Sequence, residues 1–164
     1  MHGKISCVTK LIEAGANILM FDSINGRTCL HHAACYGYSE CLQFILSAAR
    51  TSQVASSWGY SRFVNVRDGK GATPLHLAAR QRRPECVHML LDNGALVCAS
   101  TSGYGIPGST PLHLAARSGS RGCVRELLAW GADRLQTDSS ELLQMYKCGM
   151  LSKEACRKGL PCLV

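Results

Sequence analysis

Three histidines, His31, His76 and His113, occupy the same place in three copies of one repeated phrase. Imidazole is both a common metal ligand and a general base, so a repeated histidine can indicate a metal ladder or a proton-transfer site. A buried imidazole with both ring nitrogens hydrogen-bonded is the ordinary structural alternative. We favour the structural role for all three histidines.

Ten cysteines form a second set of reactive side chains. Four of them share one position in a second repeated phrase, where a small, buried, apolar role explains them best: Cys7, Cys41, Cys86 and Cys123. Equivalent positions in stacked helices lie roughly 8–10 Å apart, which is too far for a disulfide. Cys148, Cys156 and Cys162 near the C-terminus do not have zinc-site spacing. This usage of cysteine predicts a reducing compartment.

The sequence contains no recognisable catalytic constellation. Gly-x-Ser-x-Gly, a phosphate-binding loop and His-Glu-x-x-His are all absent from it. The carboxylates of Glu40, Glu85 and Glu126 are separated, whereas general acid–base chemistry needs a paired arrangement. We therefore expect a chain that is not an enzyme by itself and that holds no cofactor and no metal.

The histidines must be positioned by helices that begin just before them. Thr28, Thr73 and Thr110 stand three residues ahead of the histidines, where a hydroxyl can cap a helix N-terminus. Pro74 and Pro111 follow at the first helical position, where a missing N–H costs nothing. Apolar residues then recur at helical spacing. Each copy of the second repeated phrase, the one with the shared cysteine, predicts a second helix. Three of these helices end at a glycine: Gly15, Gly94 and Gly131.

The first phrase resembles the ankyrin repeat, Thr-Pro-Leu-His-x-Ala with a period of about 33 residues. The three threonines are 45 and 37 residues apart, so we expect insertions at Arg50–Phe63 and Ser100–Pro107. The resemblance implies an all-α repeat solenoid of helix–turn–helix units with hairpin-like loops between the repeats. It also implies that each repeated histidine ties neighbouring turns together.

We predict a partial repeat followed by three whole repeats and a divergent tail. The partial repeat, 1–21, holds a second helix only, and the whole repeats span 22–63 (with the long insertion), 64–99 and 100–135. The tail, 136–164, contains a short helix at Glu141–Lys147. Roughly three repeats are needed for stability. Apolar surface is expected at both uncapped ends, which predicts marginal stability or self-association.

Longer stretches resemble one particular family, the plant E3 ubiquitin ligases with N-terminal ankyrin repeats and a C-terminal RING finger. The stretches are Met1–Val8, Leu11–Asp22, Arg80–His88 and Leu127–Arg134. The resemblance implies that the ankyrin array recruits a protein partner, such as a receptor-like kinase or a ubiquitination substrate. Because the tail cysteines cannot supply eight zinc ligands, we expect the RING to be absent and interpret the chain as a truncated or alternatively spliced product.

The ankyrin resemblance also implies a partner-binding surface on the inner helix ends and the preceding turns. Its candidates, with one residue from the long insertion, are Asn25, Arg27, Tyr36, Trp58, Lys70, Arg80, Gln81 and Arg117. The same alignment predicts further exposed positions at Ile24, Cys35, Ala72, Ile106, Pro107, Ser109 and Ser118. The insertion aromatics Trp58, Tyr60 and Phe63 could form an exposed anchor or fold back over a repeat edge, and the sequence leaves both open.

The net charge of +7, from 18 basic and 11 acidic residues, biases the choice of partner. We expect a protein-interaction module. The alternatives are a ubiquitin-ligase component acting through a full-length copy, or a basic binder of nucleic acid or membrane surfaces. No specific nucleic-acid motif and no apolar run of about 18 residues occurs. We expect an intracellular protein, cytoplasmic or nuclear, or held at the plasma membrane by a partner.

Overall fold

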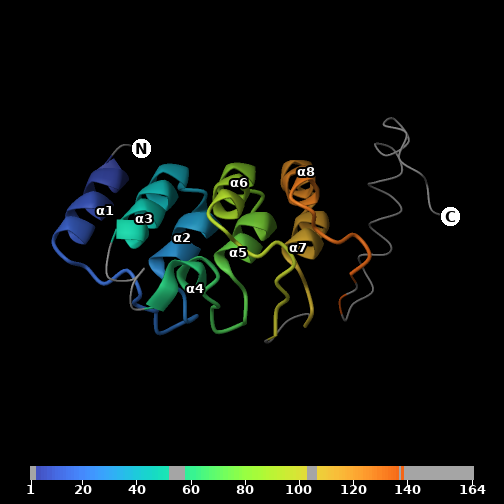
Figure 1. Cartoon of the computed structure of the whole chain (residues 1–164), viewed down its shortest axis with the longest axis horizontal. Coiled ribbons are helices and arrows are strands. Elements are labelled where there is room, and N and C mark those ends of the chain that lie inside the picture. Colours follow the sequence, from blue (N-terminus) through green and yellow to red (C-terminus); the bar gives the residue numbers. More distant parts are fainter. Residues whose placement is uncertain (1–2, 52–57, 103–106, 137, 139–164) are drawn as a thin grey trace.

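The computed structural model describes residues 3–51, 58–102, 107–136 and 138, which form a row of helix pairs (Figure 1). Within these residues the only regular elements are helices. They are α1 (Gly3–Glu13), α2 (Cys29–Tyr36), α3 (Ser39–Thr51), α4 (Tyr60–Val64), α5 (Pro74–Arg80), α6 (Pro84–Asp92), α7 (Pro111–Ser118) and α8 (Arg121–Ala129). The predicted helix Glu141–Lys147 and the three tail cysteines lie outside the described residues.

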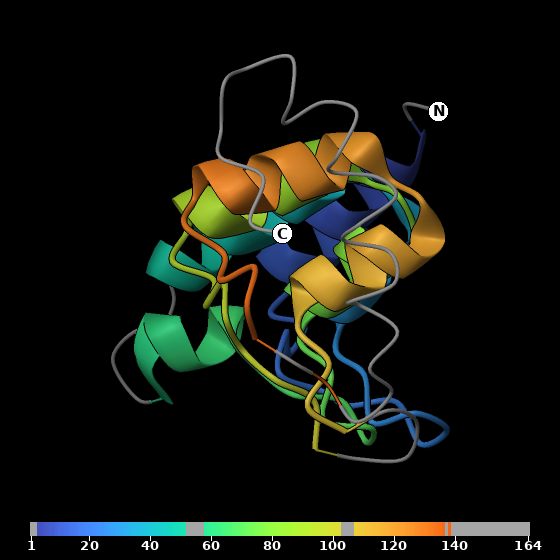
Figure 2. The same cartoon turned by 90° about the vertical axis from the view of Figure 1, so that its right-hand side faces the viewer.

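The helices stack in two rows. Helices α2, α5 and α7 contact one another in sequence and form the inner row, while α1, α3, α6 and α8 form the outer row. Viewed along the stack, the loops that precede the inner helices project from one side, and α4 lies apart from the inner row (Figure 2). The predicted all-α repeat solenoid is confirmed, whereas the exact repeat boundaries stay a prediction.

Each inner helix begins at one of the predicted threonines. Thr28, Thr73 and Thr110 have extended backbone conformations, and the backbone N–H of each donates to Nδ1 of the histidine three residues later at 3.1–3.2 Å. Because Nδ1 accepts this bond, the proton of the neutral ring resides on Nε2. The start of every inner helix therefore determines which nitrogen its histidine can use as a donor.

The second ring nitrogen forms a hydrogen bond to the next repeat. His31 Nε2 donates to the carbonyl of Ala72 at 3.2 Å, and His76 Nε2 donates to the carbonyl of Ser109 at 3.1 Å. Both side chains are fully buried. Burial disfavours the charged imidazolium and lowers the pKa of each histidine from 6.5 to about 4. The predicted structural role is confirmed for these two residues.

The turns inside the helix pairs need a left-handed backbone. Gly37 and Gly119 supply it after α2 and α7, with φ of 75° and 72°. In the central repeat Arg82 takes this place with φ of 60°, a conformation that is unfavourable for a residue with a Cβ atom. All three turns therefore need the same left-handed backbone, whichever residue supplies it.

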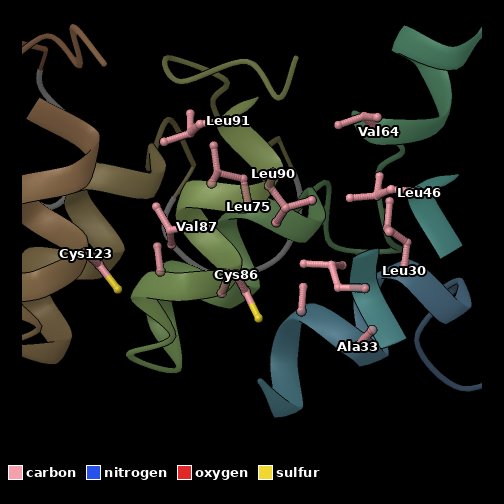
Figure 3. Close-up of a cluster of buried hydrophobic side chains, with 14 of the residues drawn as sticks. Leu30, Ala33, Leu46, Val64, Leu75, Cys86, Val87, Leu90, Leu91 and Cys123 are labelled. Carbon is pink, nitrogen blue, oxygen red and sulfur yellow. The ribbon is translucent and has the colours of Figure 1, made fainter. Parts of the chain in front are cut away.

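The core lies between the two rows of helices. Figure 3 shows side chains from α2, α3, α5 and α6 there: Leu30, Leu46, Leu75 and Leu90. Leu90 and Leu127 are completely buried, but the equivalent Leu11 in α1 is 60% exposed. Cys7, predicted to be buried like its counterparts in later repeats, is exposed as well. That prediction was wrong because the described residues place no helix pair on the outer side of α1.

The aromatic residues of the long insertion pack back onto the array. Phe63 in α4 is completely buried, and Trp58 and Tyr60 pack against the core at partial exposure. The Tyr60 hydroxyl donates to Asn93 Oδ1 at 2.6 Å, and the Arg50 guanidinium lies 4.9 Å from the centre of the Tyr60 ring. Of the two alternatives for this segment, the structure favours the one in which it covers a repeat edge.

The buried histidines make stability depend on pH. Because their folded-state pKa values lie below the unfolded value of 6.5, the unfolded chain takes up protons first as the pH falls. Their contribution is fully present above pH 6.5 and is lost as the pH falls towards 4. We expect a loss of about 2 kcal/mol per histidine in the free energy of unfolding between pH 7 and pH 5.

Urea unfolding at both pH values measures this loss. The variant His76→Gln should lose less stability than the parent over the same interval, whatever its stability at pH 7. The control Gln43→Ala changes an exposed residue of α3 that does not titrate and should keep the pH dependence of the parent. Equal stability of the parent at pH 7 and pH 5 would contradict the assignment.

A candidate protein-binding groove

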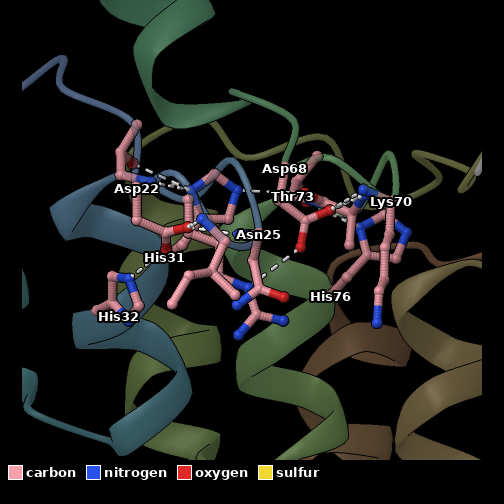
Figure 4. Close-up of polar contacts among 12 residues, drawn as sticks. Asp22, Asn25, His31, His32, Asp68, Lys70, Thr73 and His76 are labelled. Carbon is pink, nitrogen blue, oxygen red and sulfur yellow. Dashed lines mark hydrogen bonds and ion pairs between the residues drawn. The ribbon is translucent and has the colours of Figure 1, made fainter.

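The loops before the inner helices are built around carboxylates. Asp68 Oδ1 accepts from the backbone N–H groups of Lys70 and Ala72, both at 2.9 Å (Figure 4). Its Oδ2 accepts from Arg27 Nε at 3.2 Å, and its side chain is only 1% exposed. Asp68 therefore closes its own loop and holds an arginine of the preceding loop at the same time.

Asp22 plays the corresponding part in the first loop. Its Oδ1 accepts from the backbone N–H groups of Asn25 and Ile24, and His32 Nε2 lies 2.9 Å from its Oδ2. The bond from Asn25 is the largest of the effects that lower the pKa of Asp22 to about 2. The carboxylate thus stays ionised and keeps the turn closed.

Neighbouring loops are also joined backbone to backbone. The Gly69 N–H donates to the Asn25 carbonyl at 2.8 Å. A Cβ atom at position 69 would lie 2.9 Å from that oxygen, so only glycine allows this approach. Arg67 Nη1 continues the row by donating to the Ser100 carbonyl at 2.7 Å. The loops are consequently held side by side beyond the ends of the inner helices.

An open cavity of about 440 Å³ lies between these loops and the inner helices. We call it the basic groove, because four cationic side chains line it: Arg27, Lys70, Arg80 and Arg117. Hydroxyl and apolar residues complete its walls, among them Thr101, Ser109, Ser118, Leu77 and Leu114. These four cations all belong to the eight predicted site residues, so half of the predicted set converges on one hollow.

The other four predicted residues lie elsewhere. Asn25 is half-buried between two loops, and Gln81 is exposed at the end of α5. Tyr36 is 58% exposed at the end of α2, with ring centroids 6.3 Å from His32 and 5.8 Å from Tyr38. These positions could extend a contact surface along the inner row.

Trp58 belongs to a second cavity of about 480 Å³, beside α4. Phe21, Arg62 and Leu96 are among the residues that line it. Because none of its lining residues also lines the basic groove, Trp58 does not join the cationic candidates.

Two of the further positions predicted to be exposed are buried. Ala72 is 7% and Ser109 is 2% exposed. Their carbonyls receive the bonds from His31 and His76, so both must lie against the preceding repeat. Ile24 is 87% exposed, as predicted, and Ile106 lies outside the described residues.

Two of the arginines are oriented by carboxylates that the repeat pattern does not reveal. Besides Asp68, these include Asp138, whose Oδ2 accepts from Arg117 Nη2 at 3.1 Å and from Ser109 Oγ at 2.9 Å. Asp138 follows Gly131 by seven residues, just as Asp22 follows Gly15. This repeated spacing was the available signal, although Asp138 lies in the segment that looked unrelated to the repeats.

The cations of the groove fall into two kinds. Arg27 and Arg117 are ion-paired with buried aspartates. Lys70 and Arg80 are exposed and make no ion pair within the described part of the chain. Two positive charges of the groove are therefore neutralised by the protein, and two face solvent.

Neither metal binding nor membrane insertion is indicated by the described residues. They contain no group of three or more His, Cys, Asp or Glu side chains arranged to hold a metal ion. Over the same ranges, every helix is too short or too polar to cross a bilayer.

Stacked helix pairs, histidine bonds from each repeat to the next and a groove beneath joined loops define a helical repeat protein. The chain belongs to the ankyrin-repeat family, whose model for ankyrin repeats in three copies matches residues 1–101 and 60–138. The predicted ankyrin resemblance is therefore confirmed.

The chain is also similar to plant ubiquitin ligases, as the longer stretches indicated. It is 77% identical over 140 residues to the putative E3 ubiquitin-protein ligase XBAT31 of Arabidopsis thaliana. It is 71% identical over 140 residues to the E3 ubiquitin-protein ligase XB3 of Oryza sativa subsp. japonica. Both matches cover 85% of the chain but only 31% of the relative. The chain thus spans about a third of the length of these ligases.

Replacing Asp68 tests how the loops depend on a buried carboxylate. Asp68→Ala leaves two backbone N–H groups and Arg27 without their acceptor. We expect a loss of about 3 kcal/mol in the free energy of unfolding, measured by urea titration. The control Asp92→Ala removes a carboxylate that is 47% exposed and should cost less than about 0.5 kcal/mol. Equal losses in the two variants would contradict the role given to Asp68.

Proposed function

We propose that this chain is a protein-interaction module that holds a partner protein against the basic groove and the exposed ends of the inner helices. The observation that carries the proposal is the convergence of Arg27, Lys70, Arg80 and Arg117 on one open cavity. Exposed Tyr36 and Gln81 extend the surface. Tyrosine and arginine are the residue types that often carry interface energy.

The similarity to ubiquitin ligases gives this module a more specific role. We propose that it acts as the partner-recruiting arm of such a ligase and binds a receptor-like kinase or a ubiquitination substrate. The matched third of the relatives' length corresponds to the ankyrin array, to which the groove belongs. In this proposal the cations of the groove contribute binding, and any ubiquitin transfer requires a catalytic part that is similar to the remainder of the relatives.

Competition with a relative tests the recruiting role. Immobilised full-length XBAT31 captures proteins from a plant extract, and the free chain is added in excess. We expect the free chain to displace a defined subset of the captured proteins, because its ankyrin array and the similar region of XBAT31 should present similar surfaces. The double variant Tyr36→Ala, Gln81→Ala should displace them at least about 10-fold less effectively.

The matched control is Trp130→Ala, which removes an aromatic side chain that is 44% exposed at the end of α8. It should displace the captured proteins as well as the parent does. If the parent displaces nothing, the shared-partner role is wrong. If the control loses as much as the double variant, the inner-row surface is wrong.

An in vitro ubiquitination assay separates a binding arm from a ligase. The chain is incubated with ubiquitin, ATP and the activating and conjugating enzymes, and ubiquitin chains are detected by immunoblot. We expect no ubiquitin chains when this protein is the only candidate ligase, and we expect ubiquitin chains with XBAT31, the positive control. Ubiquitin chains formed with this chain alone would contradict the non-catalytic role.

A further inference from the structure

The basic groove has a charge pattern that selects among partners. Its lining residues include four cations and one carboxylate, Asp68. This carboxylate is buried and already accepts bonds from two backbone N–H groups and Arg27. We propose that the groove binds an acidic peptide segment of a partner protein, with two carboxylate side chains about three residues apart. This inference rests on the proposed interaction function, because it states the chemistry of the partner of that same surface.

The first carboxylate of the peptide is placed by Lys70 and Arg80. Both side chains are exposed, line the groove and lack an ion pair within the ranges that the structure describes. Lys70 stands on the loop before α5 and Arg80 at the end of that helix, so they approach the groove from its two sides. Hydrogen bonds between ionised groups are shorter and stronger than neutral ones, and a carboxylate between these cations would make two.

The second carboxylate is placed by Arg27. Its Nε is held by Asp68, and its side chain is 19% exposed. The terminal amino groups of a guanidinium lie on the far side from Nε, in a planar fork that matches a carboxylate. Because the bond to Asp68 fixes that fork before the peptide arrives, less conformational entropy is lost on binding.

The repeat spacing sets the distance between the two carboxylates. Arg27 belongs to the loop of one repeat, whereas Lys70 and Arg80 belong to the next repeat. Stacked helices lie roughly 8–10 Å apart. An extended polyproline II segment returns to the same face every three residues, over about 9 Å. Acidic residues at positions i and i+3 therefore match the two groups of cations.

The walls of the groove favour a peptide over a nucleic acid. Leu114 lines the groove at partial exposure, above the nearly buried Leu77 and Ala72, and can receive an apolar side chain of the peptide. A phosphate backbone is bound best by a continuous track of free cations. Here Asp68 and Asp138 interrupt such a track, because each pairs with one of the four cations and leaves Arg27 only its terminal amino groups to offer. An alternating pattern of acidic and apolar side chains fits the groove better than evenly spaced phosphates.

Selection from a random peptide library tests the inference without a known partner. The immobilised chain selects from displayed 12-residue peptides, and the enriched sequences are read. We expect acidic residues spaced i, i+3 with apolar residues near them. The best enriched peptide is then synthesised with a fluorescent label, and its Kd is measured by anisotropy. In the double variant Lys70→Gln, Arg80→Gln we expect the Kd to rise at least about 10-fold.

The matched control is the double variant Arg121→Gln, Arg125→Gln, which removes the same net charge from exposed positions of α8. Its Kd should stay within about 2-fold of the parent, because these charges lie outside the groove. Circular dichroism melts of both double variants check that they fold like the parent.

Three results would overturn the inference. The first is enrichment of peptides without acidic pairs, which would leave the displacement result, and hence the interaction function, intact. The second is an equal rise in Kd for both double variants, which would show an effect of overall charge. The third is tighter binding of a 20-nucleotide single-stranded DNA probe than of the best peptide, which would assign the groove to phosphates.

Discussion

The structure depends on an imidazole that must stay neutral between adjacent repeats. Each bridging histidine accepts from the N–H that begins its own helix and donates to a carbonyl of the next loop. A protonated ring would have no lone pair left for the first bond, so only the neutral ring with its proton on Nε2 makes both bonds at once. Since a single helix pair cannot bury its own apolar face, this bond also sets the register in which neighbouring pairs make the core.

The buried aspartates form further bonds among the loops that the histidines hold in register. Once the loops are in register, Asp68 lies beneath its own loop and within reach of Arg27, and Asp138 lies within reach of Ser109 and Arg117. Each carboxylate converts one flexible cation into a fixed part of the wall. Charge that is fixed in this way contributes to specificity more than free surface charge does, because its side-chain entropy is already lost. The groove therefore combines two arginines held by carboxylates with two exposed cations, Lys70 and Arg80, that form no ion pair within the described residues.

Local sequence signals predicted the elements well, since their causes are local. A threonine three residues before a histidine and a glycine after the last apolar turn act within one helix, and the helices begin and end there. The expected apolar surface at the ends of the array is present at Leu11, but repeat position alone gave Cys7 the wrong burial. Cys7 and Cys86 occupy the same position, but only Cys86 has a repeat on both sides.

The same distinction between local and cross-repeat causes holds for the residues of the candidate site. Repeat alignment identified the four cations of the groove, because side-chain direction follows position in the repeat. It could not show that Ala72 and Ser109 are buried, since their burial comes from bonds across repeats. Nor could it show which arginines are paired, because Asp68 lies 41 residues from Arg27 and Asp138 lies 21 residues from Arg117.

The position of the groove in the array has an energetic consequence. In a solenoid each repeat is stabilised by its direct neighbours, so the terminal repeats open first. Helix α5, which carries Arg80, contacts α2 on one side and α7 on the other, and its leucines are completely or almost completely buried. The exposed Leu11 and Trp130 lie at the two ends of the row. Among the described helices, fraying would thus loosen α1 or α8 before it reached Lys70 and Arg80, and these two cations stand on a repeat with a neighbour on each side.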